Sequence, residues 1–94
     1  MLNTLIVDDE ALARRGLKHR LLSASDVQVI GEARNGREAV EMIRKHAPDL
    51  VFLDIQMPGM DGFDVVRALK PDELPSVVFV TAYDEFAIKA FEAN

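Results

Sequence analysis

The chain has 94 residues, contains no cysteine and carries a formal net charge of −5 at pH 7. That length suits one small domain, the lack of cysteine excludes disulfides and thiolate metal sites, and the acidic balance leaves no basic footprint for nucleic acid. The apolar runs are too short to span a membrane and acidic residues come too early for a signal peptide, so we expect a cytoplasmic protein.

The first third of the chain alternates apolar runs with a helical period. Residues 2–7 predict a strand, and residues 10–22 predict a helix with Ala13, Leu17 and Leu21 on one face. The basic side chains of this helix are interpreted as a solvated face: Arg14, Arg15, Lys18, His19 and Arg20. Residues 27–33 predict a second strand, in which the polar Gln28 and Glu32 suit the edge of a sheet.

The middle of the chain repeats the same alternation. Asn35 can cap a helix, with Glu38 three residues later as in a capping box, and this helix ends before Pro48. Residues 50–53 form a continuous apolar run, which is typical of a strand buried on both faces. A loop rich in proline and glycine follows, and we interpret its glycines as turn residues.

The last third adds two further helices and one strand. Asp61 can cap a helix that stops at Pro71, residues 77–80 predict another apolar strand, and Asp84 can cap a last helix. Strands that alternate with helices in this way predict an α/β fold with a doubly wound parallel sheet and right-handed connections. Such sheets bind their ligands at the carboxyl ends of the strands.

Acidic side chains follow two of the predicted strands at those ends. Asp8 and Asp9 come directly after the first strand, Asp54 ends the third, and Thr81 ends the fourth. Carboxylates that crowd together are unfavourable unless a cation compensates them, and Mg²⁺ binds carboxylate, carbonyl, water and phosphate oxygens. The cluster therefore predicts a Mg²⁺-dependent phosphate site.

Each of these residues also has a simpler interpretation. Asp8 and Asp9 precede a helix and could merely cap it, and Thr81 is an ordinary strand residue. Asp54 is harder to explain in this way, because it ends a buried apolar strand. His19 and His46 lie on helices beside charged neighbours, so we interpret both as solvent-facing rather than as ligands.

Three segments together resemble a bacterial response-regulator receiver domain, a two-component signalling module of the flavodoxin-like fold. They are residues 5–10 (LIVDDE), 49–62 (DLVFLDIQMPGMDG) and 78–82 (VFVTA). Residues 81–92 (TAYDEFAIKAFE) resemble more narrowly the receivers joined to LytTR-type (LytR/AlgR-like) DNA-binding domains. The family resemblance implies a strand order of 2-1-3-4 for the strands present here.

The resemblance also implies a role for each residue of the site. Asp54 would accept a phosphoryl group from the phosphohistidine of a sensor histidine kinase. Asp9, Asp54 and the Gln56 backbone carbonyl would ligate Mg²⁺, and Asp8 would act through a bound water. Thr81 would donate a hydrogen bond to the phosphoryl group, and the small Ala82 would leave access to it. The chain would not be an enzyme beyond its own phosphotransfer and dephosphorylation.

The chain departs from the family pattern after its last predicted helix. The family has a fifth strand and helix, with a lysine at the end of that strand, and Lys89 lies at the wrong place to replace it. We therefore expect residues 1–94 to be an incomplete receiver that reaches DNA only through an output domain not in the chain. The fourth strand would be a sheet edge, so we expect self-association through that edge or through the last helix.

Two other classes of function remain as alternatives. A receiver-like docking or dimerisation module would share the fold without taking phosphate. A haloacid-dehalogenase-like Mg²⁺-dependent phosphatase also ends a strand in a nucleophilic aspartate, but it needs a second aspartate two residues later, and Gln56 stands there.

Overall fold

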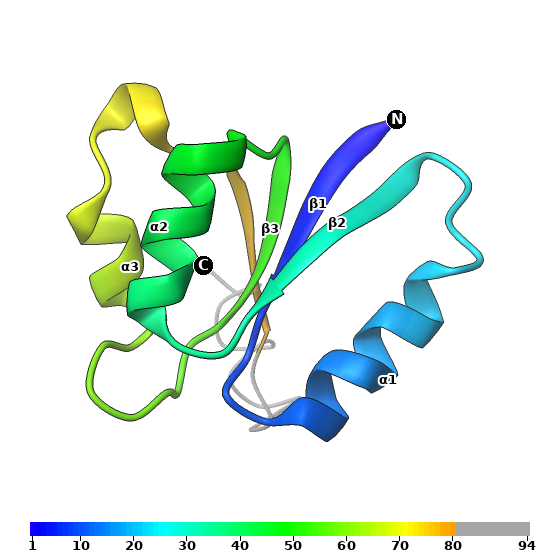
Figure 1. Cartoon of the computed structure of the whole chain (residues 1–94), viewed down its shortest axis with the longest axis horizontal. Coiled ribbons are helices and arrows are strands. Elements are labelled where there is room, and N and C mark those ends of the chain that lie inside the picture. Colours follow the sequence, from blue (N-terminus) through cyan, green and yellow to red (C-terminus); the bar gives the residue numbers. More distant parts are fainter. Residues whose placement is uncertain (81–94) are drawn as a thin grey trace, which may run out of the picture.

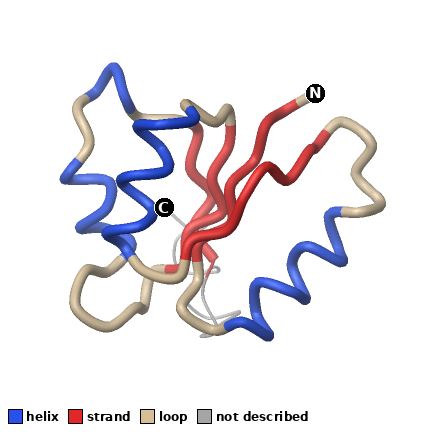
Figure 2. The backbone as a smooth tube through the Cα atoms, viewed as in Figure 1, coloured by secondary structure: helices blue, strands red, loops and turns tan. Residues whose placement is uncertain are grey.

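The computed structural model describes residues 1–80, which form a parallel sheet with helices on both faces (Figure 1, Figure 2). Its elements, in chain order, are β1 (Leu2–Val7), α1 (Ala11–Leu21), β2 (Val27–Ala33), α2 (Gly36–His46), β3 (Leu50–Asp54), α3 (Gly62–Ala68), a 3₁₀ turn (Pro71–Glu73) and β4 (Ser76–Val80). The predicted strand–helix alternation is thus confirmed over these residues, whereas the helix expected after Asp84 lies outside them.

All strand pairs are parallel, in the order β2-β1-β3-β4. In Figure 1, α1 lies on one side of the sheet and α2 and α3 lie on the other. The doubly wound fold and the strand order 2-1-3-4 are therefore confirmed. Val7 of β1 pairs with Leu53 of β3, and Asp54 pairs with Val80 of β4, so the carboxyl ends of these three strands meet at one rim.

The main hydrophobic core lies between the sheet and the pair α2 and α3. Alternate residues of the two central strands point into it and are almost completely buried: Leu5, Val7, Val51 and Leu53. Ala39 and Ile43 of α2 and Val65 of α3 pack against them. Burial of each large apolar side chain among them stabilises the fold by about 1.5–3 kcal/mol. The strand ends that carry the acids are therefore held in place by the core.

Among residues 1–80, the face of the sheet toward α1 is covered less well than the face toward α2 and α3. α1 has no buried residue: Leu17 and Leu21 are half-buried, and Ala13, predicted to share their face, is exposed. The prediction that residues 50–53 are buried on both faces is also only half right, because Phe52 on the α1 side keeps partial exposure. An apolar groove of about 290 Å³ runs between α1 and the sheet, with Leu17 and Phe52 among its lining residues.

The starts of α2 and α3 lie where the sequence predicts them. The Asn35 side chain accepts a hydrogen bond from the Glu38 backbone N–H at 2.8 Å, as a cap should. The Glu38 carboxylate, however, accepts from the backbone N–H and the guanidinium of Arg34, one residue earlier than a capping box requires. Asp61 caps α3 in a complete capping box with Asp64.

Helix α3 ends earlier than the predicted stop at Pro71. The helix stops at Ala68, and Pro71 opens a separate 3₁₀ turn that was not predicted. Proline favours the first position of such a turn because its fixed φ is already helical and its missing N–H is not needed there. Within residues 1–80, no helix combines the length and the apolar character needed to cross a membrane.

Candidate functional site

Three carboxylates meet where β1 and β3 end. Asp8 and Asp9 lie in the loop between β1 and α1, and Asp54 is the last residue of β3, the neighbouring strand. One oxygen from each carboxylate lies within 4.8 Å of the other two. The convergence predicted from the sequence is therefore confirmed for Asp8, Asp9 and Asp54, while Thr81 and Ala82 lie outside the described residues.

Asp54 is the buried member of this acid cluster. Its surface is only 8% exposed, and its carboxylate accepts one backbone hydrogen bond, from the Gln56 N–H at 3.3 Å. Burial, and then the nearby negative charge of Asp8, raise the pKa of Asp54 from 3.8 to about 6. The charged form of Asp54 is thus costly in the absence of a cation, and three hard oxygen donors fit a cation such as Mg²⁺.

Asp8 is fixed through its backbone and its side chain. Its N–H donates to the Ala33 carbonyl at the end of β2, at 3.1 Å, and its carboxylate accepts from the Glu10 N–H at 2.9 Å. The residue that precedes α1 is Glu10, and its side chain makes no capping bond. The alternative that Asp8 or Asp9 merely caps this helix is therefore wrong, although the Asp8 carboxylate does close the turn before it.

The loop between β3 and α3 returns close to the site. The Gly62 N–H donates to the Ile55 carbonyl at 2.9 Å, and a Cβ at Gly62 would stand 2.6 Å from the Asp54 carbonyl oxygen. Only glycine permits so close an approach. Gly59 has φ +76°, in the left-handed region. The interpretation as a turn residue is confirmed for Gly59, whereas Gly62 is the first residue of α3 and lies against the backbone of Asp54.

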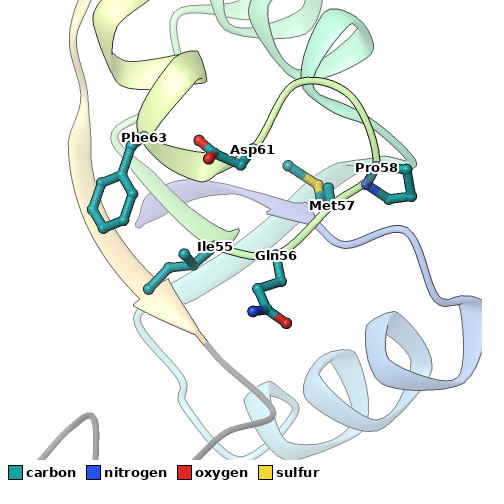
Figure 3. Close-up of a pocket in the computed structure, with 6 residues that line it drawn as sticks. All are labelled: Ile55, Gln56, Met57, Pro58, Asp61 and Phe63. Carbon is teal, nitrogen blue, oxygen red and sulfur yellow. The ribbon is translucent and has the colours of Figure 1, made fainter.

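A pocket of about 530 Å³ opens on this loop (Figure 3). Its six lining residues are Ile55, Gln56, Met57, Pro58, Asp61 and Phe63. In Figure 3 the Phe63 ring lies next to Ile55 and β4, and it contacts the Phe79 ring with a centroid distance of 5.1 Å. The one ionisable residue that lines the pocket is Asp61. Its carboxylate already caps α3, so the pocket is not a second acidic site.

One residue near the site was misjudged from the sequence. Arg14 was assigned to a solvated helix face, yet its side chain is only 13% exposed. Its guanidinium donates to the Asp8 carbonyl oxygen at 2.7 Å and to the Glu32 carboxylate at 3.1 Å. The signal that could have found it is Glu32, the one charged residue of β2. The predicted solvent exposure of His19 and His46 is confirmed.

Comparison with known proteins agrees with this geometry. The model of the response regulator receiver domain matches residues 4–94. The chain belongs to the response regulator receiver family. The family consists of receiver domains and not of catalytic enzymes, so the haloacid-dehalogenase alternative is set aside.

The curated relatives of this receiver are longer proteins. The chain is 51% identical over 92 residues to an uncharacterized response regulatory protein of Shewanella oneidensis. The matched region covers 98% of this chain and 39% of that protein. The chain is 49% identical over 94 residues to the transcriptional regulatory protein BtsR of Escherichia coli. This match covers 100% of this chain and 39% of that protein. The chain therefore spans about two fifths of the length of these relatives.

Solved receiver structures have the same fold. The signal receiver domain of the response regulator NarL from Mycobacterium tuberculosis superposes with a TM-score of 0.79 at 42% identity, over 93% of this chain and 71% of that one. A LuxR-family response regulator from Aurantimonas gives a TM-score of 0.83 at 29% identity, over 100% of this chain and 69% of that one. The receiver fold predicted from the three segments is therefore confirmed.

Proposed function

We propose that this receiver accepts a phosphoryl group on Asp54 from the phosphohistidine of a sensor histidine kinase. The observation that carries the proposal is the placement of Asp54 itself: a carboxylate at the end of a buried strand, 8% exposed, with two further carboxylates beside it. A buried acid among acids is unfavourable for stability alone, and the arrangement is typical of a functional site.

The acid cluster would hold Mg²⁺ through a set of oxygen donors that includes the Asp9 and Asp54 carboxylates, the Gln56 backbone carbonyl and, through a water, Asp8. Bound there, Mg²⁺ neutralises the carboxylates and the incoming phosphoryl oxygens. The exposed Gln56 side chain takes no part in that set and is free to influence hydrolysis of the product.

In the transfer, a carboxylate oxygen of Asp54 attacks the phosphorus atom as the bond from phosphorus to the histidine nitrogen breaks. The electron pair of that bond stays on the imidazole nitrogen, and Asp54 becomes an acyl phosphate. Little covalent chemistry is needed from the protein, because positioning and charge neutralisation carry such reactions. Thr81 would donate a hydrogen bond to the bound phosphoryl group, and the small Ala82 would leave the approach open.

The proposed output is control of transcription. The relatives named transcriptional regulatory proteins support control of transcription. The resemblance of residues 81–92 to LytTR-type receivers supports a DNA-binding output domain beyond the 94 residues, acting in the cytoplasm with a histidine kinase as partner. Self-association through the edge of β4, where Val78 is 43% exposed, remains a prediction.

The test is the intact mass of the 94-residue chain after incubation with acetyl phosphate and Mg²⁺. We expect the mass of one added phosphoryl group, no addition when EDTA replaces Mg²⁺, and none on the Asp54→Asn variant. Equal addition to Asp54→Asn would remove Asp54 as the acceptor. No addition to the unaltered chain would favour the docking-module alternative.

A further inference from the structure

Arg14 joins three parts of the fold that meet at the acid cluster. From α1, its Nη1 donates to the backbone carbonyl of Asp8 at 2.7 Å, and its Nε donates to Oε1 of Glu32 in β2 at 3.1 Å. Lys18, one turn further along α1, reaches the other carboxylate oxygen of Glu32 at 3.7 Å but is 54% exposed. Of these two cationic residues, Arg14 is the one that bonds to the loop carrying the acids.

The bond to the Asp8 carbonyl acts directly on Asp9. The carbonyl of Asp8 and the N–H of Asp9 belong to one planar peptide group. A bond that fixes the carbonyl oxygen therefore also fixes the orientation of the Asp9 backbone N–H. The N–H of Asp8 is held separately by the Ala33 carbonyl of β2. The backbone on both sides of Asp8 is thereby tied to β2, once directly and once through Arg14 and Glu32.

We infer that Arg14, held by Glu32, is a positioning residue that sets the Asp8–Asp9 pair for metal binding. It acts through the loop backbone and is not itself a ligand. The inference rests on the proposed function, because it concerns the Mg²⁺ site of the phosphoacceptor. A guanidinium suits this role better than an ammonium, because two of its nitrogens bond to different partners in a fixed geometry.

The experiment is a calorimetric titration of MgCl₂ into the 94-residue chain and its variants. Arg14→Met is expected to raise the Kd for Mg²⁺ about tenfold, which is the lower end of the effect of removing a group that orients metal ligands. The Kd of Arg14→Lys should lie between those of the unaltered chain and Arg14→Met. The single lysine nitrogen can reach either the Asp8 carbonyl or Glu32, but not both. Lys18→Met is the matched control, because it removes a cation from Glu32 but no bond to Asp8, and its Kd should not change.

Thermal unfolding in EDTA separates positioning from simple stabilisation. A purely structural Arg14 would lower the Tm while the folded variant bound Mg²⁺ as tightly as the unaltered chain. The pair Arg14→Met and Glu32→Gln provides a second criterion. If Glu32 acts through Arg14, the double variant should bind Mg²⁺ no more weakly than Arg14→Met alone, because the two effects are not additive.

The outcomes distinguish this inference from the proposed function. An unaltered chain that binds no Mg²⁺ contradicts the proposed function and the inference together. An unaltered chain that binds Mg²⁺, with Arg14→Met of the same Kd, overturns the inference alone. If Arg14→Met does not fold, Arg14→Lys and Glu32→Gln decide in its place: an unchanged Kd for both overturns the inference, and a raised Kd for both supports it.

Discussion

Replacing Asp54 by asparagine is expected to stabilise the metal-free receiver at neutral pH. The side chain is 8% exposed and faces two other carboxylates, so its charge is a cost to the folded state. The pKa of Asp54 rises from 3.8 to about 6, and a rise of this size corresponds to about 3 kcal/mol. Asparagine has the same shape, keeps an oxygen for the Gln56 N–H and carries no charge, so we expect a gain of about 2–3 kcal/mol near pH 7.

The pH dependence gives the prediction its sign. A group whose pKa is higher in the folded state binds more protons when folded, so its favourable contribution is complete below the unfolded pKa. That contribution is lost as the pH rises through about 6, the folded pKa. The advantage of Asp54→Asn should therefore be about 2–3 kcal/mol near pH 7 and shrink to about 0.5 kcal/mol near pH 4.

The assay is urea unfolding in EDTA at several pH values between these limits. Asp26→Asn is the matched control, because it makes the same chemical change at an exposed position and should alter stability by less than about 0.5 kcal/mol. An Asp54→Asn variant that is no more stable than the unaltered chain near pH 7, or whose advantage does not depend on pH, would refute the electrostatic reasoning.

Three further substitutions test the structure around the site. Gly62→Ala should destabilise the fold by about 2 kcal/mol or more in urea unfolding, because the new Cβ would stand 2.6 Å from the Asp54 carbonyl oxygen. Gly16→Ala, in helix α1 with open space at its Cβ, should instead stabilise by about 0.5–1 kcal/mol, and equal effects of the two changes would contradict the close approach at Gly62. Asn35→Ala should cost about 1 kcal/mol through loss of the cap on α2; an unchanged midpoint would show that the Glu38 N–H bond contributes nothing.

Much of the fold was predictable because its signals are local. The strand boundaries at Leu2–Val7 and Val27–Ala33 coincide with the predicted ranges. Asn35 caps α2 and Asp61 caps α3, as predicted. The meeting of Asp8, Asp9 and Asp54 was also predictable, because the carboxyl ends of adjacent parallel strands necessarily share one rim.

Other features depend on contacts between distant segments and could not be predicted in this way. A helix face rich in arginine has the same sequence pattern whether it is solvated or bonded to a loop, so Arg14 was assigned to solvent. The burial of Phe52 was overestimated, since an apolar run shows that a strand is suited to burial but not how closely each of its faces is covered. The end of α3 at Ala68 depends on the turn that Pro71 forms next to it.

The central claim, that Asp54 is the phosphoacceptor, is tested most directly by locating the phosphoryl group on the unaltered chain. After incubation with acetyl phosphate and Mg²⁺, borohydride reduction converts an acyl phosphate to an alcohol that survives digestion, and fragment masses then locate it. The account predicts a single reduced residue at position 54. Reduction at Asp8 or Asp9 instead, or at none of the three, would contradict it.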